Sequence, residues 1–356
     1  MGSLRLLPLL IAASFFFLLA HANADSGTNT KVDVFVWELS KDYPGANSND
    51  SQLPIRDVYI KTHDGTDWMS TYDSNPNAIS GPPALQSLMA TYQSQGIGVT
   101  AWFVPKGTDV DKQVAMAEQV IDSGVEALYA DAERWNGFCA ADCSFLATTF
   151  WARLRAERPN ATLGVIYDPR PQHWDASATA QWLASANVAL PMCYWESYLG
   201  QTPWGDPKGC VDQAHADLDK LAPGRPLTYA PILQGSTDPV RMQQAMRAAY
   251  QNNTDHMSIW RRGVTAAEVW AAIAAYNKPV RQGDTDCDGV VTVPDAQQLL
   301  QYVGGLASPG CLVQAGDLNC DGRYEIMDVV IVLRYLAGLS NTGPPGCTAV
   351  GSFIVI

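Results

Sequence analysis

DTDCDGVVTVPD at residues 284–295 and DLNCDGRYEIMD at residues 317–328 are one 12-residue pattern that occurs twice, 33 residues apart. Each copy places oxygen-bearing side chains at positions 1, 3, 5, 9 and 12, and a glycine at position 6, where the loop must turn sharply. Position 7 needs only a backbone carbonyl. This spacing suits a hard cation held by one short loop, so the sequence predicts two Ca²⁺ sites. The expected ligands are Asp284, Asp286, Asp288, Val290, Thr292 and Asp295 in the first copy, and Asp317, Asn319, Asp321, Arg323, Glu325 and Asp328 in the second.

Each loop runs into an apolar stretch, residues 296–303 and 329–336, that we expect to be helical. Position 12 is Asp, whereas EF-hands usually have Glu there. A duplicated loop–helix unit with this feature resembles the dockerin module, and the resemblance covers residues 283–347. It implies a small helical module that folds around two structural Ca²⁺ ions and attaches an enzyme to a cohesin domain of a scaffold or surface protein. Cohesin choice in that family depends on loop positions 10 and 11, which are Val293-Pro294 and Ile326-Met327 here.

The first 24 residues have the features of an export signal. Arg5 precedes an apolar core at residues 6–20, and Ala22-Asn-Ala24 is a typical cleavage site. We expect a secreted protein, extracellular or attached to a cell surface, with no membrane segment after cleavage. An uncleaved anchor is the alternative.

Secretion permits disulfides, and the eight cysteines form four local pairs. The equivalence of the two repeats pairs Cys287 with Cys311 and Cys320 with Cys347. Upstream, Cys139 is close in sequence to Cys143, and Cys193 is within reach of Cys210. Sequence alone does not fix this connectivity.

Composition narrows the range of partners. The net charge of −13 argues against nucleic acid. Eleven Trp and fourteen Tyr suit a protein that handles carbohydrate, because aromatic faces stack on sugar rings. Ordinary core packing must account for at least half of these aromatics.

Residues 31–279 alternate between short apolar runs and amphipathic stretches. Near-continuous apolar strands separated by helices indicate a parallel sheet buried on both faces. Eight such units in about 250 residues predict a (β/α)8 TIM barrel. An open doubly wound sheet is the alternative, although no G-x-G-x-x-G follows the first strand. The expected strands are 32–37, 57–61, 98–104, 127–131, 163–167, 188–194, 227–233 and 256–260, and expected helices include 112–123, 145–157, 176–186 and 237–251.

Barrel enzymes carry their chemistry at the C-terminal ends of the strands, and acids and aromatics recur there in this chain. Asp131 and Glu133 are two residues apart and should point to the same face. Their mutual repulsion would raise the pKa of one carboxyl, which could then protonate a leaving sugar oxygen. The alternative for such a D-x-E is a helix cap or a pair with Arg134. Expected substrate-binding residues at the rim are Trp37, His63, Asp64, Trp102, Trp135, Tyr167, Asp168, Trp195 and Trp260.

Leu128-Tyr-Ala-Asp131-Ala-Glu133 resembles the end of the strand-4 signature of family 18 glycoside hydrolases, although Glu126 and Tyr129 replace its first two Asp residues. The resemblance implies that Glu133 is the general acid and that Asp131 positions a substrate acetamido group. Met192-Cys-Tyr194 resembles the M-x-Y motif of that family, whose Tyr holds the same group. Residues 60–66, IKTHDGT, are similar instead to the IKATEGT run of family 25 lysozymes. Both families cleave glycans with N-acetylated amino sugars.

Glu38 and Glu196 are competing candidates for the second catalytic carboxylate. We therefore expect a secreted glycoside hydrolase of polysaccharide catabolism, with no cofactor in catalysis. A non-catalytic carbohydrate-binding barrel displayed through the dockerin is the alternative. A deacetylase or peptidase would need a metal cluster or a nucleophile motif such as G-x-S-x-G, and the sequence has neither.

Overall fold

The computed structural model describes residues 30–42, 50–171, 176–235, 238–254, 256–276, 280–286, 289–307, 315–339 and 347–354. The expected export signal, the calcium ligand Asp288 and the Cys287–Cys311 pair lie outside the described residues. Among the described residues, no helix has the length and apolarity to cross a membrane.

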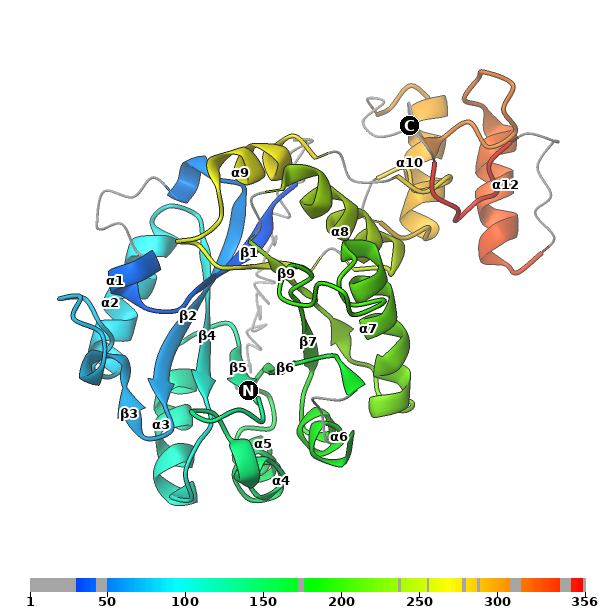
Figure 1. Cartoon of the computed structure of the whole chain (residues 1–356). Helices are drawn as coiled ribbons and strands as arrows, with labels where there is room; N and C mark the ends of the chain where they lie inside the picture. Colours follow the sequence, from blue (N-terminus) through cyan, green and yellow to red (C-terminus); the bar gives the residue numbers. More distant parts are fainter. Residues whose placement is uncertain are drawn as a thin grey trace, which may run out of the picture.

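Residues 30–276 form a closed barrel of parallel strands surrounded by helices (Figure 1). The barrel closes because β1 pairs in parallel with β2 on one side and with β10 on the other. The short strands β8 and β9 share one position, and both pair with β7. This arrangement confirms the predicted (β/α)8 barrel. The strands are β1 (Val32–Val36), β2 (Ile55–Asp64), β4 (Gly98–Val104), β5 (Leu128–Asp131), β6 (Leu163–Tyr167), β7 (Val188–Cys193), β8 (Thr228–Tyr229), β9 (Ile232–Gln234) and β10 (Ser258–Trp260).

Strand alternation separates two apolar layers. Val34 and Val36 on β1 pack outward in the core between strands and helices, whereas Phe35 between them belongs to a second cluster inside the barrel. Both faces of the strands are therefore buried, which is why the strands appear in the sequence as near-continuous apolar runs. The same alternation decides which side chains at the strand ends point into the barrel.

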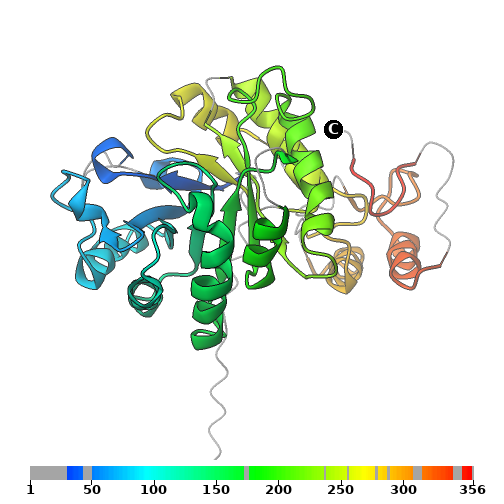
Figure 2. The ribbon, with the colours of Figure 1, turned by 60° about the horizontal axis from the view of Figure 1, so that its bottom comes forward.

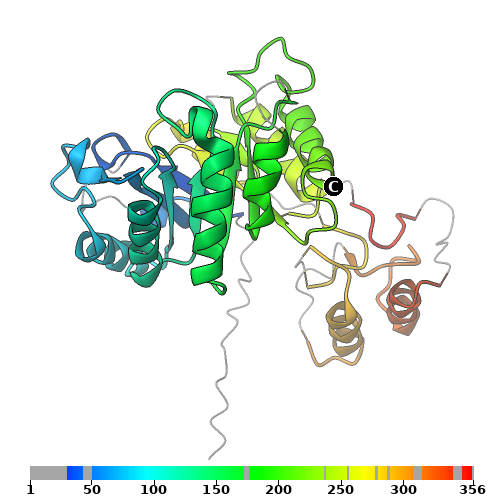
Figure 3. The same ribbon diagram turned by 90° about the horizontal axis from the view of Figure 1, so that it is seen from below.

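The amphipathic stretches form the outer ring of helices, which Figure 2 shows with the bottom of the Figure 1 view turned forward and Figure 3 shows from below. Asp109 and Asp238 cap the first turns of α3 and α8 by accepting hydrogen bonds from backbone N–H groups. The predicted helix at 145–157 is continuous but includes a π-helical segment, η4 (Ala147–Trp151). The other barrel helices are α1 (Leu39–Asp42), α2 (Pro82–Gln93), α3 (Val110–Asp122), α4 (Cys143–Leu146), α5 (Ala152–Glu157), α6 (Ala176–Ala184), α7 (Pro207–Leu221), α8 (Pro239–Gln251) and α9 (Ala267–Ala274), with short 3-10 turns η1 (Asp50–Gln52), η2 (Met69–Thr71) and η3 (Ala140–Asp142).

Strand β2 is longer than the sequence predicted and ends in a small hairpin. Its last residues pair antiparallel with β3 (Asp67–Trp68) through a turn at Gly65, whose φ of 55° favours glycine. The register between β2 and β4 shifts between Lys61 and His63, which marks a β-bulge. This bulge changes which side chains of the strand face the barrel interior.

The C-terminal region forms a separate helical unit beside the barrel (Figure 1). Helices α10 (Val293–Val303) and α12 (Ile326–Leu336) pack on each other around Leu299 and Val332. Each begins at position 10 of its acidic loop with a capping box, in which Asp295 and Asp328 are the third helical residues. Arg281 lies at the start of the C-terminal unit. It hydrogen-bonds Asn253, which follows α8 in the barrel.

Three of the four expected disulfides lie within the described residues and are confirmed: Cys139–Cys143, Cys193–Cys210 and Cys320–Cys347. The first closes a short loop after β5, and the second ties β7 to α7. The third joins the second acidic loop to the chain that follows α12.

Candidate functional site

A cavity of about 280 Å³ opens at the C-terminal ends of the barrel strands. Seven of the residues predicted from the sequence line it: Trp37, Asp64, Trp102, Asp131, Glu133, Tyr194 and Trp260. The wall also contains Phe35, Lys61, Val104, Gly137, Phe138, Ile166, Met192 and Ile232. The cavity thus combines carboxylates, one ammonium group and aromatic faces at the end of the barrel where such enzymes work.

Strand β5 brings Asp131 and Glu133 to the cavity together. Asp131 is the last residue of the strand and Glu133 follows two positions later, so both side chains point inward. Asp131 is 5% exposed, and its Oδ1 has no hydrogen-bond partner in the described part of the chain. Burial, and then the charge of Glu133, raise the pKa of Asp131 well above its usual range. This pair favours holding one proton at neutral pH.

Glu133 has the environment of a general acid. Burial raises its pKa to about 7, and the charge of Asp168 contributes in the same direction. A hydrogen bond with Trp135 and the charge of Arg170 act in the opposite direction. Arg170 Nη2 and Nε hold Asp168 at 2.6 and 3.0 Å, so this carboxylate stays fixed near Glu133. A carboxyl with a pKa near 7 stays largely protonated in mildly acidic to neutral solution.

The loop after β5 is closed on the carbonyl oxygen of Glu133. The Cys139 Sγ lies 3.1 Å from this oxygen, and the Ala140 N–H donates to it at 3.4 Å. The Cys139–Cys143 disulfide closes the same loop, which contributes Gly137 and Phe138 to the cavity wall. The contacts from Cys139 and Ala140 therefore hold the backbone of Glu133 in place.

Aromatic rings form the bottom of the cavity. Trp102 is 1% exposed, and its indole N–H donates to the carbonyls of Val36 and Tyr59 at 3.2 and 3.1 Å. Trp260 lies 5.8 Å from Trp102 and 6.2 Å from Tyr194 between ring centroids. Such a floor offers an apolar face for a sugar ring.

Three predicted substrate-binding residues lie outside the cavity, in the layer between strands and helices. His63 is fully buried and stacks on Phe103 at 4.7 Å, and burial lowers its pKa to about 3. The β-bulge after Lys61 turns it outward. Tyr167 and Trp195 are also in this outer core. On β6, alternation places Tyr167 opposite to its inward neighbour Ile166, whereas Trp195 follows the cavity residue Tyr194 just beyond the end of β7.

The remaining candidates surround the cavity without lining it. Glu38 forms an ion pair with Lys41 at 2.9 Å. The Glu196 backbone N–H donates to Gln234 Oε1 at 2.8 Å. Asp168 and Trp135 act on Glu133, as described above.

Sequence reasoning missed Lys61 and Phe138 as cavity residues. Lys61 lies two positions after the inward-facing Tyr59, so alternation along β2 was the available signal. Phe138 comes from the disulfide-closed loop, for which the sequence carries no comparable periodicity.

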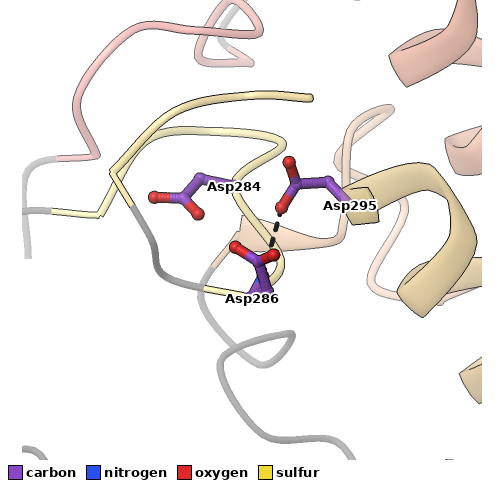
Figure 4. Close-up of side chains that lie close together, drawn as sticks. All are labelled: Asp284, Asp286 and Asp295. Atoms are coloured by element: carbon purple, nitrogen blue, oxygen red, sulfur yellow. Dashed lines mark hydrogen bonds between the residues drawn. The ribbon is translucent and has the colours of Figure 1, made fainter. Parts of the chain in front are cut away.

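The first acidic loop of the C-terminal unit gathers three carboxylates (Figure 4). Oxygen atoms of Asp284, Asp286 and Asp295 lie within 4.8 Å of one another. Asp284 and Asp295 are buried, and Asp295 accepts backbone N–H bonds from Thr285 at 2.7 Å and from Asp286 at 3.2 Å. Buried carboxylates this close repel one another, and all their donor atoms are oxygen, so the loop fits a hard cation such as Ca²⁺.

The second loop repeats this arrangement at equivalent positions. Asp328 is buried and accepts from the backbone N–H of Leu318 at 2.8 Å and of Asn319 at 3.3 Å. Asp317 Oδ2 accepts from Gly322 N at 2.8 Å, as Asp284 Oδ2 does from the corresponding Gly289 at 3.0 Å. Shared hydrogen bonds at shared positions give the two loops one geometry.

Comparison with known families identifies the C-terminal unit. Residues 282–337 match the family model described as the dockerin type I domain. This segment is therefore a dockerin domain, of a type that binds Ca²⁺ and docks to cohesins and that occurs on extracellular cellulosomal proteins. The chain matches no curated protein.

The barrel is similar to solved glycoside hydrolase structures. The endo-1,4-beta-mannanase from Rhizomucor miehei matches with a TM-score of 0.50 at 12% identity, over 70% of this chain and 94% of the mannanase. A GH18 chitinase from Pseudoalteromonas aurantia matches with a TM-score of 0.49 at 13% identity, over 69% and 99% of the two chains. The spore cortex-lytic enzyme SleL from Bacillus cereus gives 0.48 and 10%, over 69% and 74%. The chain is a TIM barrel that resembles glycoside hydrolases at low identity and carries a dockerin type I domain.

Proposed function

We propose that the barrel hydrolyses O-glycosyl bonds of a glycan, with Glu133 as the general acid. The single observation that supports this most strongly is the Asp131–Glu133 pair at the C-terminal end of β5, inside a cavity with an aromatic floor. Burial and Asp168 bring the pKa of Glu133 to about 7, so its carboxyl can hold a proton until the leaving oxygen takes it.

Asp131 and Tyr194 then act on the substrate beside the cleaved bond. The Oδ1 atom of Asp131, without a partner in the described part of the chain, would accept a hydrogen bond from a substrate N–H. Tyr194 lines the same cavity, and burial raises its pKa well above its usual range, so its O–H stays a donor. A donor and an acceptor side by side suit an acetamido group, whose carbonyl oxygen would attack the anomeric carbon as Glu133 protonates the leaving oxygen. Water then attacks the anomeric carbon and gives its proton to Glu133, which opens the cyclic intermediate, regenerates the acetamido group and completes the hydrolysis.

We also propose that the chain is exported and binds two Ca²⁺ ions in its dockerin, one in each acidic loop. Asp284, Asp286 and Asp295 would hold the first ion, and their equivalents Asp317, Asn319 and Asp328 the second. The chemistry that each ion supplies is neutralisation of a loop whose carboxylates otherwise repel. The module would attach the barrel to a cohesin-bearing scaffold or surface protein, so that hydrolysis takes place where the partner is anchored.

The test is Glu133→Gln in the full chain, assayed on chitin, peptidoglycan and plant glycans. The amide keeps the shape but cannot donate the proton, and loss of a general acid typically costs about 10²–10⁴ in rate. Glu196→Gln and Glu38→Gln are the matched controls, because both carboxylates lie near the cavity without lining it.

A Glu133→Gln protein with parental turnover would disprove the assignment. If the Glu196 or Glu38 variant is the inactive one, the acid lies on a different strand. A parent that binds these glycans and cleaves none of them would be a carbohydrate-binding barrel displayed through the dockerin.

A further inference from the structure

Two lysines share one carboxylate in the wall of the cavity. Lys61 Nζ lies 2.7 Å from Asp64 Oδ1, and Lys106 Nζ lies 3.3 Å from Asp64 Oδ2. Counted formally, the trio carries one net positive charge. The chain as a whole has a net charge of −13, so the sign of this local charge is opposite to that of the protein.

The lysine nearer the catalytic pair is deeply buried. Lys61 is 4% exposed and lines the cavity, where it lies 5.0 to 5.9 Å from the ring centroids of Trp37, Tyr72 and Trp102. An ammonium group has three N–H donors, and Asp64 is the ion-pair partner of Lys61 within the described residues. Burying a charge is costly unless partners compensate, so this position calls for a further acceptor when water leaves the cavity.

The turn beside Asp64 is built to admit the second lysine. Gly65 has a φ of 55°, and a Cβ there would lie 2.9 Å from Lys106 Cγ and 2.8 Å from the Lys106 carbonyl oxygen. A side chain at this position would therefore clash with Lys106, which would have to shift. The Lys106 side chain is 34% exposed and meets Asp64 without lining the cavity itself.

The cavity is therefore divided by charge. On the β2 side Lys61 lines the cavity and Lys106 compensates the charge of Asp64 from outside it, whereas the end of β5 contributes Asp131 and Glu133. An anion would be repelled from the β5 side and attracted to the β2 side. The two sides of the cavity therefore suit a substrate that places its glycosidic oxygen at Glu133 and an anionic group at Lys61.

We propose that the glycan cleaved here carries an anionic substituent, a carboxylate or a sulfate, which Lys61 binds next to the cleaved bond while Lys106 compensates the charge of Asp64. The proposal rests on the proposed function and adds its substrate class. It makes the two lysines specificity residues: they select the charged sugar, while the carboxylates perform the cleavage.

Binding to the Glu133→Gln protein tests the inference independently of turnover. Four probes are titrated by calorimetry. They are a β-1,4-linked tetrasaccharide of N-acetylglucosamine and N-acetylmuramic acid, the same tetrasaccharide with its carboxylates amidated, chitotetraose, and chitotetraose sulfated at O6. The first two probes differ only in charge at the carboxylate, and the last two differ in the sulfate.

We expect at least one anionic probe to bind about 10- to 100-fold more tightly than its neutral counterpart, the range of a hydrogen bond to a charged group. The pair that shows the preference identifies the anion. Adding Lys61→Met should abolish the preference, while Lys61→Arg retains part of it. Lys208→Met, an exposed lysine on α7, is the matched control and should retain it fully.

Lys106→Met leaves Lys61 with its partner Asp64 and should weaken the preference even where Lys61→Met impairs folding. Equal binding of charged and neutral probes, or a preference that survives both Lys61→Met and Lys106→Met, would overturn the inference. So would the absence of binding by all four probes. The proposed hydrolysis would stand in those cases if Glu133→Gln still abolishes cleavage, whereas it fails separately if the parent cleaves no glycan.

Discussion

The pair Asp168 and Arg170 allows the acid to be tuned in opposite directions. The pKa of Glu133 rises from an ordinary 4.5 to about 7, with burial as the largest cause and the charge of Asp168 as the second. The charge of Arg170 lowers it. Asp168→Asn removes the negative charge and frees the guanidinium, so both changes lower the pKa of Glu133. Arg170→Gln removes the cation and frees Asp168, so both changes raise it.

The size of the pKa change expected in Asp168→Asn follows from the rise of the Glu133 pKa above its ordinary value. If Asp168 accounts for less than half of it, its removal lowers the pKa by about one unit, or about 1.4 kcal/mol. Because the general acid must be protonated, the alkaline limb of kcat/KM should move about one pH unit downward in Asp168→Asn. At pH 8 the rate should then fall about tenfold below the parent, and at pH 5 it should be nearly unchanged. In Arg170→Gln the alkaline limb should move upward.

The assay is kcat/KM between pH 4 and 9 on a glycan that the parent cleaves, with circular dichroism to confirm folding at each pH. Asp122→Asn is the control, because this carboxylate pairs with Arg158 on the helical surface far from the cavity. If the alkaline limb of the pH profile of kcat/KM is unchanged in both variants, or shifts in the same direction in both, the electrostatic account of Glu133 is refuted.

Three further predictions concern the rest of the chain. Chelation of Ca²⁺ should lower the midpoint of the dockerin transition in calorimetry of the full chain, since saturation at about 100 times Kd contributes about 2.7 kcal/mol; unchanged transitions in chelator would contradict the two-ion proposal. Non-reducing peptide mapping should recover Cys287–Cys311 beside the three disulfides described, and a link from Cys287 to any other cysteine would show that the repeat equivalence misassigned it. Burial raises the pKa of Asp57 to about 7, so its neutral form stabilises the fold fully below about pH 4, and this contribution is lost as pH rises through 7. In urea unfolding, Asp57→Asn should therefore weaken the fall in the free energy of unfolding between pH 4 and 7. An unchanged pH dependence in this variant would contradict the prediction.

Much of the barrel was predictable because its strands are buried on both faces. Runs such as residues 98–104 and 163–167 are apolar throughout, and they coincide with β4 and β6. The spacing of Asp131 and Glu133 likewise predicted a shared face, and both line the cavity. The acidic loops were predictable for a related reason: a loop that surrounds a cation draws nearly all of its ligands from one short stretch of sequence.

The features that could not be predicted depend on contacts between segments that are distant in the sequence. His63 follows a bulge that depends on how β2 pairs with β4, so its outward position could not be inferred from a regular alternation. Tyr167 and Trp195 are aromatic residues at strand ends, and only the closed barrel shows that they face the helices. The pKa of Glu133 depends on Asp168, which is brought to it by the pairing of β5 with β6. The sequence by itself determined the barrel, the dockerin and the carboxylate pair, because each rests on local spacing. The shape and charge of the cavity were decided by the tertiary structure alone, because Lys61, Asp131 and Glu133 meet only when the barrel closes.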